Sequence, residues 1–404
     1  MLSRIARRIE RLLDTRTAEE LDISDLLARS IEFRGRFEAL QRELNPGHFR
    51  WYPYNSFANF AHFDRLLTGE RRRLLALARG GPVIDIGCAD GALAFFLESL
   101  GLRVHALDHP ASNYNRMQGV AALKQALSSD VEILAADLDR EIHLPEPFYG
   151  LAFFLGILYH LKNPFHALET LASRSRYLVL STRIARYTPG RRTDLAEEPV
   201  AYLLEEGEAN RDWTNFWIFS DAGLRRLLGR AGWRVLDYQV FGSGEASEPA
   251  DGDADARAFC LAQSRLVDAE TNLRLLGGWH ELEYRTWRWT ERRFSLAADA
   301  PEGATALEFF FSIPGEVFGR LGPLTLSARV NGAPLPPRIF TAAGPQRYAA
   351  ALPPGVAGDL RLEFELDKGL RDPGLDAREL GVQVCFSRDD AHDERRCSAP
   401  LCVY

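Results

Sequence analysis

Apolar runs and helical stretches alternate through the middle of the chain, most clearly around residues 83–108. An apolar run over 83–86 leads into a turn with two glycines. A stretch over 92–100, with apolar side chains on one helical face, follows that turn. A second apolar run over 104–107 ends at Asp108. Short, nearly continuous apolar runs are typical of strands that a parallel sheet buries on both faces. The order of strand, glycine turn, helix and strand therefore predicts the first half of a doubly wound α/β sheet, with a nucleotide site at the carboxyl ends of its strands.

Five further apolar runs extend this sheet. They lie at 131–135, 151–155, 177–181, 233–240 and 256–262. The last two follow a helical stretch and predict a closing hairpin. Together with the first two runs, they predict a seven-stranded, Rossmann-like α/β domain over 51–265.

The first fifty residues differ from this domain because their periodicity is helical throughout. Residues 4–14 and 21–43 each place apolar side chains on one helical face. We therefore expect an N-terminal helical segment over 1–50. Arginines surround the apolar face of 4–14, which would suit an anionic membrane surface. Such a face more commonly packs on its own protein or on a second subunit, which would make a homo-oligomer.

The last third of the chain has a different period. Residues 307–313 alternate between apolar and other side chains, and Asn331-Gly332 is a strong hairpin signal. Short alternating strands without helices predict an all-β sandwich over 266–404. The run 376–381 resembles a segment of β-domains attached to bacterial glycan-assembly enzymes, which implies a binding or assembly role.

Composition narrows the class of protein. The chain has 404 residues, of which 46% are hydrophobic and 26% are charged, as in soluble globular proteins. A formal net charge of -7 argues against a broad nucleic-acid-binding surface. The five cysteines are scattered without a CxxC pair or a Cys/His cluster, which predicts reduced thiols and no metal site. There is no signal peptide and no apolar run long enough for a transmembrane segment, so we expect a cytoplasmic protein.

The turn after the first strand carries the first chemical signal. It contains Asp85, Gly87, Asp90 and Gly91 and no basic residue. Glycines let the backbone turn sharply and approach a ligand, while the two acids would repel a phosphate. The acids suit a cofactor that carries a positive amino group and a sulfonium. Asp108, at the end of the second strand, is placed to accept hydrogen bonds from both hydroxyls of a ribose.

This turn resembles motif I of class I S-adenosylmethionine-dependent methyltransferases, and Asp108 matches their ribose-binding acid. The fourth strand ends in Gly156-Ile-Leu-Tyr159-His160-Leu-Lys-Asn-Pro164. This ending resembles a broad subgroup that contains the tRNA wobble-uridine carboxymethyl transferases and many uncharacterised bacterial methyltransferases. The resemblance implies S-adenosyl-L-methionine as the cofactor. The residues that it implies for cofactor binding are Asp85, Gly87, Cys88, Ala89, Gly91, Asp108, His109, Asp137, Leu138, Leu155 and Gly156.

Candidate residues for the acceptor side come from three parts of the chain. By the resemblance, Tyr159 lies at the reactive end of the cofactor. His160, whose ordinary pKa is near neutrality, and Asp212 are candidate general bases for an oxygen nucleophile. His160 could equally pack after the strand. Asp212 belongs to a polar insertion, 183–219, of the kind that forms lids and binding loops. The candidate substrate-binding residues are Tyr54, Tyr114, Arg116, Asn210, Trp213 and Asn215.

These observations favour an enzyme that methylates a hydroxyl of a glycan or another polar metabolite. One alternative is a tRNA-modifying methyl or carboxymethyl transferase. The tRNA enzymes hold a carboxylated cofactor partly through lysines before motif I, whereas the first lysine here is Lys124. We therefore expect ordinary S-adenosylmethionine and a small-molecule or glycan partner. Another alternative is a non-catalytic binding protein with a relic cofactor site, and the intact set of acids and glycines stands against it.

Overall fold

The computed structural model describes residues 16–44, 47–79, 81–140, 142, 144–146, 148–249, 255–265, 273–283, 287–300, 303–356, 358–372, 376–385 and 401–403. The chain divides into two compact units, Met1–Ser264 and Arg265–Tyr404. The helix predicted over 4–14 lies outside the described residues.

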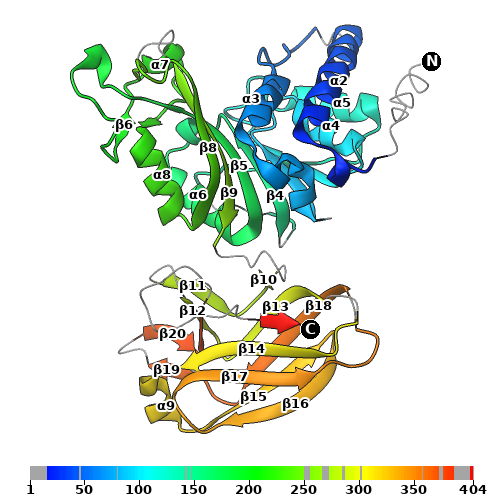
Figure 1. The fold of residues 1–404 in the computed structure, drawn as a ribbon, viewed down its shortest axis with the longest axis vertical. Helices are drawn as coiled ribbons and strands as arrows, with labels where there is room; N and C mark the ends of the chain where they lie inside the picture. Colours follow the sequence, from blue (N-terminus) through cyan, green and yellow to red (C-terminus); the bar gives the residue numbers. More distant parts are fainter. Residues whose placement is uncertain are drawn as a thin grey trace. The chain divides into compact units, whose positions relative to one another are not determined.

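The first unit is built on a nine-stranded mixed sheet (Figure 1). Strands β3-β2-β1-β4-β5 are parallel neighbours in that order, and β9 runs antiparallel between β5 and β8. All seven predicted strands are present, and β8 with β9 is the predicted closing hairpin. The strands are β1 (Val83–Ile86), β2 (Val104–Asp108), β3 (Glu132–Ala135), β4 (Tyr149–Leu155), β5 (Ser175–Ile184), β6 (Ala201–Leu203), β7 (Trp217–Phe219), β8 (Trp233–Gly242) and β9 (Ala256–Ser264).

Helices connect the parallel strands, which confirms the predicted Rossmann-like fold. Two of these helices begin at recognisable start signals. Pro164 occupies the first turn of α6, and the Ser220 hydroxyl caps α8 by accepting a hydrogen bond from the Gly223 amide. The helices after β1, β2, β4 and β7 are α4 (Ala92–Ser99), α5 (Gln118–Leu127), α6 (Pro164–Arg174) and α8 (Asp221–Arg230).

The insertion after β5 is more ordered than a polar loop. Its strands β6 and β7 pair antiparallel, and β7 joins the sheet where Phe219 pairs with Ile184 at the end of β5. A short helix, α7 (Glu208–Arg211), lies between these two strands in the sequence. The insertion therefore continues the sheet beyond the carboxyl end of β5, at the edge where sheets of this kind bind ligands.

Helices α2 (Ile23–Leu44) and α3 (Asn59–Leu66) share the core of the sheet domain. The ring of Phe33 on α2 lies 5.4 Å from the ring of Phe96 on α4. Phe60 and Phe63 on α3 are at most 1% exposed. The helical periodicity over 21–43 thus marks a face that packs on the α/β sheet.

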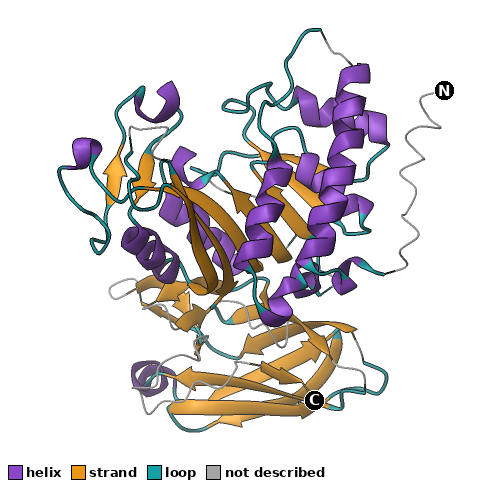
Figure 2. Ribbon diagram, turned by 45° about the horizontal axis from the view of Figure 1, so that its top comes forward, coloured by secondary structure: helices purple, strands orange, loops and turns teal. Residues whose placement is uncertain are grey.

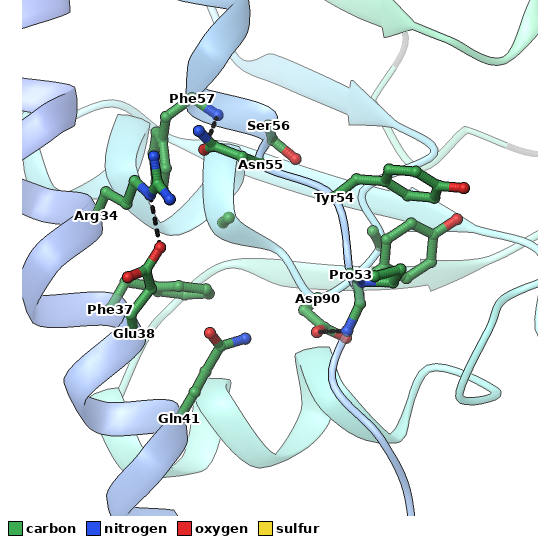
Figure 3. Close-up of a pocket in the computed structure, with 13 residues that line it drawn as sticks. Arg34, Phe37, Glu38, Gln41, Pro53, Tyr54, Asn55, Ser56, Phe57 and Asp90 are labelled. Carbon is green, nitrogen blue, oxygen red and sulfur yellow. Dashed lines mark hydrogen bonds and ion pairs between the residues drawn. The ribbon is translucent and has the colours of Figure 1, made fainter. Parts of the chain in front are cut away.

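A hollow lies between α2 and the segment 52–57 (Figure 3). It has about 550 Å³ of empty space, part of which is open solvent. Asp90 borders this hollow, and its carboxylate accepts a hydrogen bond of 2.6 Å from the Tyr52 amide. The hollow therefore adjoins the glycine turn, and the same aspartate ties the segment before β1 to that turn.

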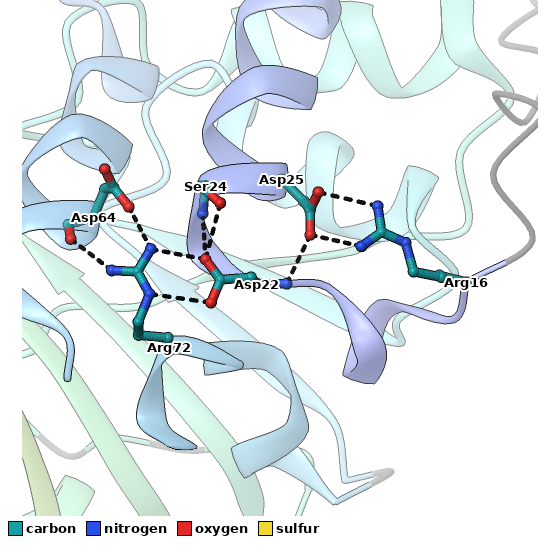
Figure 4. Close-up of polar contacts among 6 residues, drawn as sticks. All are labelled: Arg16, Asp22, Ser24, Asp25, Asp64 and Arg72. Carbon is teal, nitrogen blue, oxygen red and sulfur yellow. Dashed lines mark hydrogen bonds and ion pairs between the residues drawn. The ribbon is translucent and has the colours of Figure 1, made fainter. Parts of the chain in front are cut away.

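Ion pairs fasten the start of α2 to its neighbours (Figure 4). The Arg72 guanidinium lies 2.8 Å from Asp22 and 2.7 Å from Asp64. Arg16 pairs with Asp25 at 2.8 Å. Hydrogen bonds from these arginines lower the pKa values of Asp22 and Asp25. The contacts fix where α2 begins relative to the chain after α3.

The second unit consists of antiparallel sheets (Figure 2). A five-stranded sheet, β10-β13-β18-β15-β16, and a six-stranded sheet of β11, β12, β21, β14, β17 and β22 share one apolar core. A helix, α9 (Gly315–Leu321), interrupts the strands, which corrects the expectation of strands alone. The strands are β10 (Arg274–Leu275), β11 (Trp279–Glu283), β12 (Trp287–Thr290), β13 (Arg293–Ala300), β14 (Ala306–Ile313), β15 (Leu324–Val330), β16 (Ala333–Phe340), β17 (Gly344–Ala351), β18 (Gly358–Leu366), β19 (Leu370–Asp372), β20 (Asp376–Leu380), β21 (Gln383–Cys385) and β22 (Leu401–Val403).

The run 376–381 has an architectural role in this unit. The Gly381 amide donates to the Thr290 carbonyl at 2.7 Å, and a Cβ at Gly381 would lie 2.5 Å from the Thr290 hydroxyl. Arg378 pairs with Glu283 at 2.7 Å. These contacts fasten the run to β11 and β12, which explains its glycine and arginine without a ligand.

One prediction about cysteine is wrong. Cys385 is disulfide-bonded, whereas the scattered cysteines predicted reduced thiols throughout. Cys88 and Cys260 are free and buried. Sequence spacing does not show which cysteines meet across a sheet, because that depends on strand register. None of the helices in the described part of the chain is long and apolar enough to cross a membrane.

Candidate functional site

The glycine turn joins β1 to α4 and is fastened to β2. The amides of Gly87 and Cys88 both donate to the Leu107 carbonyl, at 2.8 and 3.1 Å. Gly87 has a φ of +75°, and a Cβ there would lie 2.0 Å from the Ile157 side chain. The positive φ is sufficient to favour glycine at this position, and the Ile157 side chain, which follows β4, packs against the same face of the turn. The sequence pattern did not indicate this contact.

Asp108 is held beside that turn by three hydrogen bonds. Its carboxylate accepts from the Ala89 amide at 2.8 Å, the His109 amide at 2.7 Å and the Asn113 side chain at 3.0 Å. Burial raises its pKa despite these contacts. The predicted residues Ala89, Asp108 and His109 are thus brought together where β2 ends. Asn113 is an additional support that the list of predicted residues lacked.

The two acids of the turn have different surroundings. Asp85 is 5% exposed, and burial, followed by the charge of Asp108, raises its pKa to about 7. The Asp90 carboxylate is already engaged by the Tyr52 amide and by the Asn115 side chain, at 2.6 and 2.7 Å. Asp85 is therefore the more buried acid of the turn, with a pKa raised by burial, whereas Asp90 ties the turn to the segment before β1 and to Asn115.

The other predicted cofactor residues follow β3 and β4. The Ala136 amide donates to the Asp108 carbonyl, so Asp137 and the buried Leu138 come directly after that contact. Asp137 pairs with Arg140 at 3.2 Å on an exposed surface. After Leu155, Gly156 has a φ of +74°, and a Cβ there would lie 3.3 Å from the Tyr159 hydroxyl. The predicted set thus gathers at the carboxyl ends of β1 to β4.

His160 contacts the insertion through its Nδ1 atom. This atom lies 2.9 Å from the Thr214 hydroxyl and 3.2 Å from the Thr214 carbonyl oxygen. The Thr214 hydroxyl is in turn 2.6 Å from a carboxylate oxygen of Asp212. Burial lowers the pKa of His160, while the Asp212 charge partly opposes that shift. The structure thus joins the predicted His160 and Asp212 through Thr214, which was not among the predicted site residues.

Hydrogen-bond roles in this chain fix the proton on the imidazole. The Asp212 carboxylate can only accept, so the single proton of the Thr214 hydroxyl points to it. The hydroxyl therefore offers a lone pair to His160, as does the Thr214 carbonyl. Nδ1 of the neutral imidazole must then carry the proton, which leaves Nε2 as a free base.

Arg257 is a site residue that sequence reasoning missed. It lies on β9, 98 residues from Tyr159, and its Nη1 donates to the Tyr159 hydroxyl at 3.3 Å. The guanidinium carbon is 5.7 Å from the centre of the Tyr159 ring. A basic residue at the start of an otherwise apolar strand was the available signal. The sequence alone could not place Arg257 in the site. Because β9 is antiparallel, the start of this strand lies at the carboxyl edge of the parallel strands.

The predicted substrate residues divide into exposed and engaged side chains. Tyr54, Tyr114 and Trp213 are 77%, 54% and 65% exposed. Arg116 is exposed as well, in a backbone conformation with a φ of +56°. The Asn215 amide instead donates to the Ala209 carbonyl at 2.8 Å, inside the insertion. The side chain of Asn210 lies outside the described structure.

Tyr52 connects the exposed aromatic side chains to the rest of the site, although it was not among the predicted substrate-binding residues. Its ring centre lies 5.7 Å from those of both Tyr54 and Tyr114. Burial raises the pKa of Tyr52, and the nearby charge of Asp108 adds to this effect. Among the described residues, no group of three or more His, Cys, Asp and Glu side chains is arranged to hold a metal ion.

Comparisons with known proteins give one family match and several remote similar structures. Residues 57–238 match a family model described as a methyltransferase domain. One similar structure is the N-terminal domain of EvdMO1 with S-adenosylhomocysteine bound, at 16% identity and a TM-score of 0.37, covering 62% of this chain and 99% of that one. Another is the 1,6-didemethyltoxoflavin-N1-methyltransferase of Burkholderia thailandensis, at 19% identity and a TM-score of 0.32, covering 46% and 71%. An S-adenosylmethionine-dependent methyltransferase from Mesorhizobium loti has 18% identity and a TM-score of 0.34, covering 48% and 94%. A comparison with curated proteins gives no match.

The family match places a methyltransferase domain over residues 57–238. The strand order of the first unit is that of a Rossmann-like α/β sheet.

Proposed function

We propose that this domain methylates a hydroxyl of a small polar acceptor, such as a sugar unit of a glycan. The observation that carries the proposal is the contact of His160 with Thr214 and Asp212, because it leaves Nε2 of the imidazole unprotonated. A hydroxyl is a weak nucleophile at neutral pH and gains reactivity when a positioned base takes its proton. With an acceptor that needs no base, the same contact would only join the insertion to the end of β4.

The proposed cofactor site fits S-adenosylmethionine by its chemistry. Asp85 and Asp108 are acids with raised pKa values, and a positively charged ligand beside them would favour their ionised forms. Asp108 would hold the ribose, while the turn through Cys88 and Ala89 would line the cofactor. Bound there, the cofactor supplies an electrophilic methyl group. The protein must then align the acceptor oxygen with that group and exclude water, and such positioning can supply much of the rate.

The acceptor would lie against exposed aromatic and polar side chains. Trp213 and Tyr54 present apolar faces to solvent, and exposed aromatic faces of this kind suit stacking on a sugar ring. His160 lies beside Tyr159, with 4.4 Å between their ring centres, so the base adjoins the proposed reactive end of the site. This combination supports a polyol acceptor over an apolar one.

The experiment compares two variants of Thr214. Thr214→Val removes the hydroxyl, while Thr214→Ser keeps it and serves as the matched control. Methyl transfer from labelled S-adenosylmethionine would be measured on a panel of glycosides and hydroxy acids. We expect Thr214→Val to lower kcat by about tenfold to a hundredfold, within the range of general-base effects, and Thr214→Ser to stay near wild type. Calorimetric binding of S-adenosylhomocysteine should be unchanged in both. Equal turnover of the two variants would contradict the role of His160 as base.

A further inference from the structure

A partly exposed guanidinium, that of Arg257, lies at the edge of the proposed acceptor site. Arg257 is the second residue of β9 and is in register with Arg183 on β5 and Phe241 on β8. Because β9 is antiparallel to β5, its first residues lie at the carboxyl ends of the parallel strands, where sheets of this kind bind ligands. The Arg257 side chain is 37% exposed, so part of it can meet a ligand.

Asp255 is the carboxylate beside this arginine. The Nε of Arg257 is 3.5 Å from one carboxylate oxygen of Asp255, while the other oxygen of Asp255 lies 3.0 Å from Nε of the buried Arg183. The contact of Arg257 with Asp255 is thus made through Nε and is longer than a charge-assisted hydrogen bond.

Arg257 also retains hydrogen-bond donors. A guanidinium has five N–H donors in a planar fork. Within the described ranges, the acceptors recorded around Arg257 are the Tyr159 hydroxyl at 3.3 Å from Nη1 and the Asp255 carboxylate beside Nε. The remaining N–H groups form the kind of edge that binds a carboxylate through two parallel hydrogen bonds.

The position of this edge points to the acceptor. A Cβ at Gly156 would lie 3.3 Å from the Tyr159 hydroxyl and 3.9 Å from Nη1 of Arg257, so both groups front the end of β4. The methionyl part of the proposed cofactor carries a carboxylate beside its positive amino group, so binding of S-adenosylhomocysteine must be compared between wild type and Arg257→Gln. A large loss of that binding in a folded variant would assign Arg257 to the cofactor. His160 and Arg257 lie on the same tyrosine, 4.4 Å and 5.7 Å from its ring centre. A base and a cation are thus within reach of one sugar-sized molecule.

We infer that the methyl acceptor carries a carboxylate bound by Arg257, with its reacting hydroxyl at His160. The substrate class is therefore a hydroxy acid or a uronic acid unit, free or within a glycan. This inference rests on the proposed function and narrows its substrate.

The test uses the full chain saturated with S-adenosylhomocysteine. Binding of methyl glucuronide, methyl galacturonide and lactate is measured by ligand-detected NMR, beside methyl glucoside, methyl galactoside and propane-1,2-diol. Each pair differs chiefly in the carboxylate. We expect at least one acid to bind at least about tenfold more tightly than its neutral counterpart, as for a hydrogen-bonded charge pair. Arg257→Gln should abolish that preference.

Arg65→Gln is the matched control. Arg65 is a neighbouring cation that lies over the Phe241 ring at 4.6 Å, so its loss should leave the preference intact. Unchanged binding of S-adenosylhomocysteine and an unchanged melting temperature would show that Arg257→Gln remains folded. The inference is overturned if no acid is preferred, or if the preference survives in Arg257→Gln.

A carboxylated cofactor is the other source of the same chemistry. Native mass spectrometry of the purified protein distinguishes it from S-adenosylmethionine by mass. Its recovery as the main bound species would assign Arg257 to the cofactor and overturn the inference. If the proposed function is wrong, no hydroxyl methylation will be detected although cofactor is bound. This result differs from a loss of acid preference, so the two claims can be rejected separately.

Discussion

Burial moves the pKa values of two site residues in opposite directions, because one group is charged when protonated and the other when deprotonated. The pKa of His160 falls, so its neutral form is favoured near neutral pH. The pKa of Asp85 rises to about 7, so its protonated form is favoured. Burial therefore keeps His160 in the neutral form that a base requires. It also makes the ionisation of Asp85 sensitive to a nearby cation.

The rate should depend on pH through His160. A base must be unprotonated, so the rate should rise with pH through the pKa of His160 and then level off. Burial lowers that pKa below the ordinary value of about 6.5, which places the rise on the acid side of it. Asp212→Asn removes a charge that raises the pKa, and it should move the rise to still lower pH. Initial rates at saturating substrate between about pH 5 and pH 9 would check this. A shift toward higher pH in Asp212→Asn would contradict it.

The ionised form of Asp85 should destabilise the ligand-free protein, and bound cofactor should offset this destabilisation. A carboxyl whose pKa is raised on folding contributes stability that is complete below its unfolded pKa, near 4, and is lost as pH rises through about 7. At pH 8 the buried charge is uncompensated. Asp85→Asn should therefore raise the melting temperature of the ligand-free protein at pH 8 by several degrees. It should also weaken binding of S-adenosylhomocysteine.

Scanning calorimetry at pH 5 and pH 8 separates this charge effect from simple repacking. The gain in melting temperature should be larger at pH 8, where wild-type Asp85 is ionised. A gain of equal size at both pH values would point to packing, and a loss at pH 8 would contradict the prediction.

At the scale of elements, the insertion and the turn after β4 act together. The Phe216 amide donates to the Tyr159 carbonyl at 2.8 Å, which fixes the insertion beside the 3-10 turn Leu158–His160. The same contact brings Thr214 to His160. The insertion thus lies beside the proposed base, and its Trp213 is exposed to solvent.

Trp213→Ala tests this role of the insertion. Trp213 is 65% exposed, so its removal should barely change the melting temperature. It should raise KM for a glycoside acceptor by about fivefold to tenfold through lost stacking, with binding of S-adenosylhomocysteine unchanged. Steady-state kinetics on the best acceptor would measure the effect. The exposed Leu203 of the same insertion provides a control, since Leu203→Ala should leave KM alone. An unaltered KM in Trp213→Ala would remove the tryptophan from the acceptor site.

At the scale of the whole molecule, each unit has its own apolar core. The core that contains Val83, Phe96 and Leu261 is confined to the first unit, and the core that contains Phe309 and Phe364 is confined to the second. All candidate cofactor residues lie between Asp85 and Gly156, within the first. We therefore expect cofactor binding to depend on the first unit alone.

A fragment ending at Arg265 should retain cofactor affinity. The cut falls just after β9, so it removes no strand of the nine-stranded sheet. Calorimetry with S-adenosylhomocysteine would compare the fragment and the full chain, using only material that shows a cooperative melt. A large loss of affinity in a folded fragment would mean that the second unit helps to form the cofactor site, and the predicted boundary would be wrong.

The sequence by itself determined the local features of this protein. The strand runs, the glycine turn and the terminal Asp108 could be predicted because burial between layers imposes a short-range pattern of apolar residues. The periodicity over 21–43 identified α2 for the same reason. These features placed the cofactor candidates at one edge of the sheet before any contact was known.

Only the tertiary structure decided which distant side chains meet. Thr214 lies 54 residues from His160, and Arg257 lies 98 residues from Tyr159. Neither contact has a pattern in the sequence, because strand register and the path of the insertion bring these residues together. Gly87 shows the same division, since the turn was predictable and the packing of the Ile157 side chain against it was not. Periodicity records whether a position is buried, whereas hydrogen-bond partners depend on geometry between segments, and the chemistry of this site lies in those partners.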